Sequence, residues 1–239
     1  PDRAMERTSI TWAASITKAA FGTWVVQLSE KGLVDLDQPV ASMLRQPLAS
    51  YAEWADRSRA LVADPRWTRV TPRMLLSLTS GLGNFAMFEP DTQMHLHHDP
   101  GTAFRYSGEG LNVLQLALEE RFGKSLPELM DADLFRPLGL TRTAVAFRSE
   151  FEPDMADRFG TEGQFLAKTR RNARAAGSMT SSAEDLARFG IALMDGRVLG
   201  KAAMEEMLRP QIQLRGAHQF PLPDDPPFSA ETERVGLAY

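Results

Sequence analysis

Three features are absent from this 239-residue chain, and each absence excludes a class of protein. There is no cysteine, which excludes disulfide bonds, thiol catalysis and cysteine-bound zinc. No stretch approaches the roughly 20 apolar residues of a membrane-spanning helix, because Lys18, Thr23 and Gln27 interrupt the longest apolar region. There is no excess of basic residues: 27 Lys and Arg face 31 Asp and Glu. The resulting net charge of −4 provides no general field to attract nucleic acid or an anionic membrane.

The composition that remains is that of a folded globular protein, with 43% hydrophobic and 24% charged residues. A chain of this length forms one large domain or two interlocked ones. The one basic run, 168–174, is expected to be a solvated surface stretch. The chain opens at Pro1 without an initiator methionine and stops at Tyr239 within an apolar run, so we expect a fragment of a longer protein.

Helical patterns dominate the chain. Residues 12–28 are apolar on nearly every face, which predicts a helix buried all round and ended by Gly32. Thr71 and Pro72 are typical of a helix start, and Gly123 of a helix end. The predicted helices after the first are 36–44, 71–78, 111–122, 125–135, one that is capped by Ser181 or Ser182 and ends near Met194, and 201–208. We expect irregular structure with short extended pieces over 141–180 and a loop over 211–234, hence a helix-rich α+β fold.

The chemistry of the chain centres on Ser15 and Lys18, near the start of the buried helix. Residues three apart on a helix share a face, with Cβ atoms about 5–6 Å apart. A serine hydroxyl becomes a good nucleophile when an adjacent base takes its proton. A lysine can be that base if burial lowers the pKa of its ammonium group. The helix N-terminus adds a positive dipole end and a free backbone N–H for a developing oxyanion.

A Ser-x-x-Lys match is common by chance, and the alternative is a capping serine beside a lysine that extends to solvent. The neighbours of Lys18 at three and four residues are Ala14, Ser15, Phe21 and Gly22, none of which is a carboxylate. A buried lysine without an acidic partner needs a functional explanation. The surroundings therefore favour catalysis.

Two further patterns are ambiguous in the sequence. Three histidines in the segment 94–99 could suggest a metal, but loop histidines this close more often face solvent, so we predict no metal site. Phe85, Met87 and Phe88 could line an acyl pocket or pack a loop onto the core. No Gly-x-Ser-x-Gly motif is present, which disfavours an α/β-hydrolase.

A resemblance to a known family joins these motifs. The segment 13–18, Ala-Ala-Ser-Ile-Thr-Lys, and the segment 27–40 after it resemble the first motif of the serine β-lactamase and penicillin-binding-protein superfamily. Within that superfamily, the chain most resembles class C β-lactamases, D-alanyl-D-alanine peptidases and related esterases. Further blocks follow in the family's order at 70–81, 100–108, 135–141 and 176–186.

The resemblance implies roles for two more residues. The family's Tyr-x-Asn motif appears here as Tyr106-Ser-Gly108, so Tyr106 is expected to move protons between nucleophile, leaving group and water. The alternative is a core tyrosine with a satisfied hydroxyl. Gly108, at the position of the family's substrate-binding Asn, offers no side-chain amide. We therefore expect simple esters to be preferred to β-lactams and peptides, and Gly108→Asn to raise β-lactam turnover.

The fold implied by the resemblance is β-lactamase/transpeptidase-like: an antiparallel sheet flanked by helices, with a helical insertion. Residues 1–34 would hold the nucleophile helix of the α/β part, 35–175 a mainly helical insertion with the tyrosine motif, and 176–239 the return to the α/β part. The family's third motif is not found; residues 235–239 resemble the strand before it. Part of the sheet and the second oxyanion donor are therefore expected to lie outside this chain.

The predicted function is that of a serine hydrolase that forms an acyl-enzyme on Ser15, most simply an esterase, although the fragment itself is expected to be inactive. The alternatives are a β-lactamase or D-alanyl-D-alanine peptidase, and a non-catalytic binding homologue. No cofactor is required, and the predicted partner is a small ester or amide, not nucleic acid or a membrane. The resemblance and the lack of cysteine favour an extracytoplasmic or periplasmic location. The sequence leaves the oligomeric state open.

Overall fold

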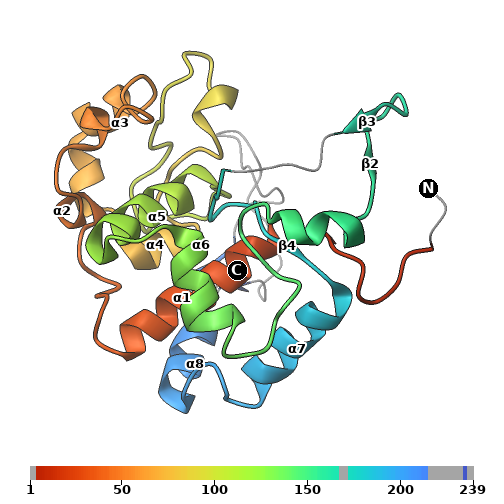
Figure 1. The fold of residues 1–239 in the computed structure, drawn as a ribbon. Coiled ribbons are helices and arrows are strands. Elements are labelled where there is room, and N and C mark those ends of the chain that lie inside the picture. The colour runs from red at the N-terminus through yellow and green to blue at the C-terminus, as the bar shows by residue number, and fades with distance from the viewer. Residues whose placement is uncertain (1–3, 167–171, 215–233, 236–239) are drawn as a thin grey trace.

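The computed structural model describes residues 4–166, 172–214 and 234–235. Helices provide most of the regular structure of this part of the chain (Figure 1). The α-helices are α1 (Ile16–Glu30), α2 (Val40–Met43), α3 (Arg59–Ala63), α4 (Pro72–Leu76), α5 (Glu109–Phe122), α6 (Leu126–Met130), α7 (Ala183–Met194) and α8 (Lys201–Leu208). Short 3-10 helices are η1 (Leu48–Ser50), η2 (Pro65–Arg69), η3 (Ala86–Phe88) and η5 (Ser149–Asp154), and η4 (Asp131–Phe135) is a π-helical turn.

The described strands form three antiparallel pairs of two residues each. They are β1 (Thr11–Trp12) with β4 (Thr180–Ser181), β2 (Arg158–Phe159) with β3 (Phe165–Leu166), and β5 (Ile212–Gln213) with β6 (Arg234–Val235). Figure 1 shows the β2–β3 hairpin standing out from the helices. The extended pieces expected within 141–180 are present as β2, β3 and β4. The loop predicted over 211–234 is wrong at its ends, where Ile212–Gln213 pairs with Arg234–Val235; residues 215–233 lie outside the described residues.

The core lies around α1 and α5. Phe21 and Trp24 of α1 are fully buried, with ring centroids 5.8 Å apart, and the Trp24 indole donates a hydrogen bond to Asp133. Leu114 and Leu118 of α5 are also fully buried. Helix α1 contacts α8, whereas α5 contacts α2 and α4 (Figure 1). The buried side chains of α1 and α5 belong to one hydrophobic core.

Helix ends agree with the predicted capping residues at several places. Thr71 accepts a hydrogen bond from the Met74 N–H at the start of α4, and Ser182 accepts one from Asp185 at the start of α7. Gly123 adopts a left-handed φ of 64° after α5. These contacts satisfy backbone groups that a helix leaves unpaired at its ends.

The start of the first helix was predicted wrongly. Helix α1 begins at Ile16 and not at residue 12, because Trp12 pairs with Thr180 in the β1–β4 ladder and Ala14 adopts a positive φ of 45°. The sequence around residue 12 does not show this pairing, because Thr180 of β4 lies far along the chain. The turn at Ala14 is likewise next to a hydrogen bond with a distant residue, from the Ala13 N–H to the Met179 carbonyl. The correction matters for function because it places Ser15 at the N-cap of the helix rather than within it.

Candidate active site

The turn before α1 positions Ser15. Ala14 has a left-handed φ of 45°, which is uncommon for a residue with a side chain, and Ser15 follows with φ −69° as the N-cap. The Ser15 side chain makes no capping hydrogen bond to the helix. Strained backbone of this kind persists where the surrounding structure holds it, and it clusters at functional sites. The hydroxyl of Ser15 is therefore held at the helix start without being used to cap it.

The segment 176–179 holds this turn from the other side. The Ala13 N–H donates to the Met179 carbonyl at 2.9 Å, and the Met179 N–H donates to Thr17 Oγ1 at 3.0 Å. The Thr17 hydroxyl in turn donates to the Ala14 carbonyl at 2.5 Å. Three hydrogen bonds thus fix the residues on both sides of Ser15.

Ser15, Lys18 and Tyr106 meet at one point. Lys18 Nζ donates to Ser15 Oγ at 3.1 Å, and the Tyr106 hydroxyl donates to the same oxygen at 2.7 Å. Lys18 Nζ also lies 4.7 Å from the centroid of the Tyr106 ring. These distances are those at which a lysine or a tyrosine, once deprotonated, can take the proton of a serine hydroxyl. The structure therefore brings together the three residues selected from the sequence, and their catalytic roles stay a prediction.

The environment of Lys18 excludes the alternative of a lysine that extends to solvent. Its side chain is buried, with 3% of the residue surface exposed. Its second hydrogen bond, at 2.5 Å, is to the backbone carbonyl of Ala176. Both hydrogen-bond partners are neutral oxygens, which stabilise an ammonium less than a carboxylate would. Tyr106 is also buried, but its hydroxyl reaches Ser15, so the alternative of a purely structural tyrosine loses support.

A cavity of about 440 Å³ opens beside the three residues. One part of its wall is apolar and consists of Phe85, Met87 and Phe88. From the sequence, these residues could either line an acyl pocket or pack a loop onto the core. The other wall residues are Ala14, Ser15, Lys18, Arg57, Asn84, Tyr106, Glu109, Asn112, Arg174, Ala176 and Gly177. The cavity volume falls within the range of small-molecule sites.

Gly108 does not contribute to this wall. It is the N-cap of α5, and its N–H donates to the side chain of Asn84 at 2.9 Å. A Cβ at this position would lie 2.4 Å from Cζ of Phe85 and 3.2 Å from Cβ of Ala176. The Phe85 ring therefore fills the space that a longer side chain would need. The expectation that Gly108→Asn alone raises β-lactam turnover needs correction, because Phe85 must first move.

Besides Asn84, four polar wall residues were not selected from the sequence. Glu109 and Asn112 lie three apart at the start of α5 and so share a face, which the sequence did not show to point inward. Arg57 and Arg174 come from distant loops. The position of Glu109 immediately after the tyrosine motif was the only local signal for any of the four.

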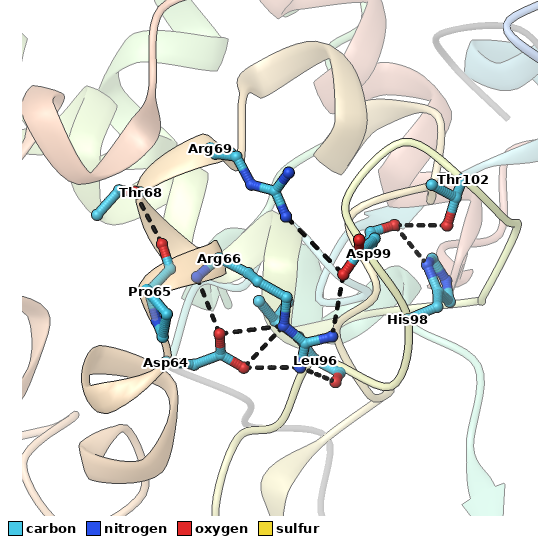
Figure 2. A network of polar contacts seen from close by, with 9 residues as sticks. All are labelled: Asp64, Pro65, Arg66, Thr68, Arg69, Leu96, His98, Asp99 and Thr102. Atoms are coloured by element: carbon cyan, nitrogen blue, oxygen red, sulfur yellow. Dashed lines mark hydrogen bonds and ion pairs between the residues drawn. The ribbon is translucent and has the colours of Figure 1, made fainter.

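The histidine segment is held by other contacts. Figure 2 shows Arg66 between Asp64 and Asp99, with its Nη2 also donating to the Leu96 carbonyl at 2.8 Å. His98 Nδ1 lies 2.9 Å from the Asp99 carbonyl. The histidines at 95 and 97 contact separate carboxylates, at 91 and 89. In the described residues, no group of three or more such side chains is arranged to hold a metal ion.

Comparison with known proteins identifies the family. A model of the family described as Beta-lactamase matches residues 2–232, and the chain therefore belongs to the Beta-lactamase family. Among curated proteins, the putative penicillin-binding protein PbpX of Bacillus subtilis is 25% identical over 213 residues. This match covers 83% of the chain but 50% of PbpX, so the chain spans half the length of that relative.

Solved structures support the same fold. D-amino acid amidase from Ochrobactrum anthropi SV3 aligns with a TM-score of 0.66 and 25% identity, over 87% of this chain and 62% of its own. EstCE1, a hydrolase with promiscuous acyltransferase activity, aligns with a TM-score of 0.72 and 18% identity, over 99% and 70%. The predicted β-lactamase/transpeptidase-like fold class is thereby confirmed. Within the described residues, no helix is both long enough and apolar enough to span a membrane.

Proposed function

We propose that the protein is a serine hydrolase that forms an acyl-enzyme on Ser15. The observation that carries the proposal is the contact of Ser15 Oγ with both Lys18 Nζ and the Tyr106 hydroxyl, at 3.1 and 2.7 Å, beside an open cavity. Nucleophilic catalysis requires a serine that is hydrogen-bonded to a base, and a base that other groups hold in position. The relatives named as an amidase and a hydrolase support this reaction class.

In the proposed reaction, Ser15 Oγ attacks the carbonyl carbon of an ester or amide, and its proton passes to Lys18 or Tyr106. The C–O or C–N bond then breaks, and the leaving group takes a proton from Tyr106. Water attacks the acyl-enzyme and gives up a proton to the same groups, which return a proton to Ser15 Oγ as its bond to the acyl carbon breaks and the acid leaves. The backbone N–H of Ser15, at the start of α1, supplies one donor for the oxyanion.

Esters are the substrates that the cavity favours. Its apolar side, Phe85, Met87 and Phe88, suits an acyl group, and Met87 and Phe88 are 72% and 68% exposed at its edge. Gly108 supplies no amide for a substrate's acyl-amide group. The competing function is that of a β-lactamase or D-alanyl-D-alanine peptidase. The other alternative, a binding homologue without catalysis, is disfavoured because the Ser15 contacts are intact.

The test uses the complete protein that contains this chain. A fluorophosphonate should label the protein on Ser15, and a p-nitrophenyl ester should be hydrolysed. Ser15→Ala should abolish both, whereas Ser42→Ala, which removes an exposed serine from α2, should change neither. Unchanged ester hydrolysis in Ser15→Ala would show that the nucleophile is another residue.

A further inference from the structure

The carboxylate of Glu109 is a buried charge in the wall of the Ser15 cavity. It belongs to the first residue of α5, and its side chain is 4% exposed. Asn112, one turn later, faces the same cavity. A carboxylate so completely removed from water requires compensation by hydrogen bonds or by an opposite charge.

That compensation is incomplete in the described residues. Arg57 Nε lies 3.0 Å from Glu109 Oε1, but the two are not aligned as a hydrogen bond, and Oε1 is buried without a donor. Nε and Nη2 of Arg57 are buried without an aligned acceptor as well. Burial raises the pKa of Glu109 above its usual value, and the nearby Arg57 and Arg174 offset this only in part. The carboxylate would therefore gain from an additional cationic donor.

The arginines are less suited to bind an anion of the substrate. Glu53 pairs with Arg174 and lies 3.6 Å from Arg57, so each arginine already has a carboxylate partner. Their side chains are both 29% exposed, compared with 4% for Glu109. The most desolvated charge of the group is Glu109.

The cavity also continues past Glu109. A second cavity, of about 280 Å³, shares Arg57, Phe85, Met87 and Glu109 with the first and adds the exposed carboxylate of Asp56 to its wall. Glu109 thus lies where the two spaces adjoin. A substrate group that extends from Ser15 in this direction meets acidic side chains.

We propose that Glu109 is a specificity determinant that binds a protonated amino group of the substrate. This inference rests on the proposed hydrolase function and narrows its substrates to esters or amides that carry an ammonium group. The ammonium donates to the Glu109 carboxylate and balances its charge, while Arg57 remains its ion-pair partner. A neutral group of the same shape leaves the carboxylate uncompensated.

The experiment compares two esters of nearly equal shape on the complete protein. Alanine methyl ester carries an ammonium group where methyl isobutyrate carries a methyl group. Rates are measured at about pH 6, where the amine is protonated. Each rate is divided by the rate without enzyme, because the ammonium group also makes the ester intrinsically more reactive. We expect kcat/KM to favour the amine by about 10- to 100-fold, as for a hydrogen bond to a charged group. Glu109→Gln should abolish this preference by lowering kcat/KM for alanine methyl ester relative to methyl isobutyrate.

A control and a binding measurement separate the two proposals. Glu205→Gln, which neutralises an exposed carboxylate on α8, should keep the preference. Calorimetry with Ser15→Ala should show alaninamide binding more tightly than isobutyramide, and adding Glu109→Gln should remove the difference. Hydrolysis of both esters without preference for the amine refutes the proposed role of Glu109 but leaves the hydrolase proposal standing. Amine-selective binding without hydrolysis supports Glu109 and refutes the hydrolase, and preference for a succinate monoester refutes Glu109 in favour of the arginines.

Discussion

Thr17→Val tests whether the hydrogen bonds around the Ser15 turn set the geometry of the nucleophile. Valine has nearly the shape of threonine, so the change removes one hydroxyl and little packing volume. Thr17 is fully buried, and its hydroxyl accepts from the Met179 N–H and donates to the Ala14 carbonyl. No residue of the catalytic contacts is altered.

The cost follows from what each partner retains. Met179 is 1% exposed, so its N–H becomes a buried donor without an acceptor, at a cost of about 1–3 kcal/mol. The Ala14 carbonyl still accepts from the Thr17 N–H at 3.0 Å, so only the net value of one hydrogen bond is lost there, about 0.5–1.5 kcal/mol. Together they predict a loss of about 1.5–4.5 kcal/mol in the free energy of unfolding.

The assay is urea unfolding together with the rate of fluorophosphonate labelling. Relaxation of the left-handed Ala14 turn should displace Ser15 from Lys18, and labelling should slow by on the order of 10- to 100-fold. Thr17→Ser keeps the hydroxyl and should behave much more like the unmutated protein in both measurements. Equal stability and labelling in Thr17→Val and Thr17→Ser would refute the reasoning.

Three other outcomes are expected. Short acyl esters should exceed penicillins in kcat/KM by about 100-fold, because Gly108 supplies no amide; equal hydrolysis of a chromogenic cephalosporin would contradict this. Gly108→Asn alone should lose about 1–3 kcal/mol of stability by overlap with Phe85 and gain no β-lactam turnover, whereas Gly108→Asn with Phe85→Ala should gain it. Hydrogen bonds from Arg73 hold the pKa of Asp37 below 3.8, so the partly exposed pair adds about 0.5–1 kcal/mol above that pH. Asp37→Asn should remove this stabilisation at pH 7, and the loss should shrink as the pH falls through the lowered pKa of Asp37; an equal loss at every pH would refute it.

Local rules of helix geometry explain the agreement between sequence and structure. Ser15, the N-cap of α1, and Lys18 lie three positions apart, so helical geometry brings their side chains to the same face. The starts of α4 and α7 follow from Thr71 and Ser182, because a hydroxyl at the N-cap satisfies a nearby backbone N–H. The order of the family motifs along the chain also predicts the fold class.

Tertiary contacts decided the rest. Tyr106 reaches Ser15 across 91 positions, and Arg57 approaches Glu109 from a separate loop, so neither distance has a local signal. The left-handed turn at Ala14 depends on hydrogen bonds from residues beyond 175. The ring of Phe85 fills the space at Gly108, although the sequence suggested only a missing side chain there. The residue types and helical spacing thus determined which groups could react, whereas packing between distant segments decided which of them meet, because burial and contact depend on the whole fold.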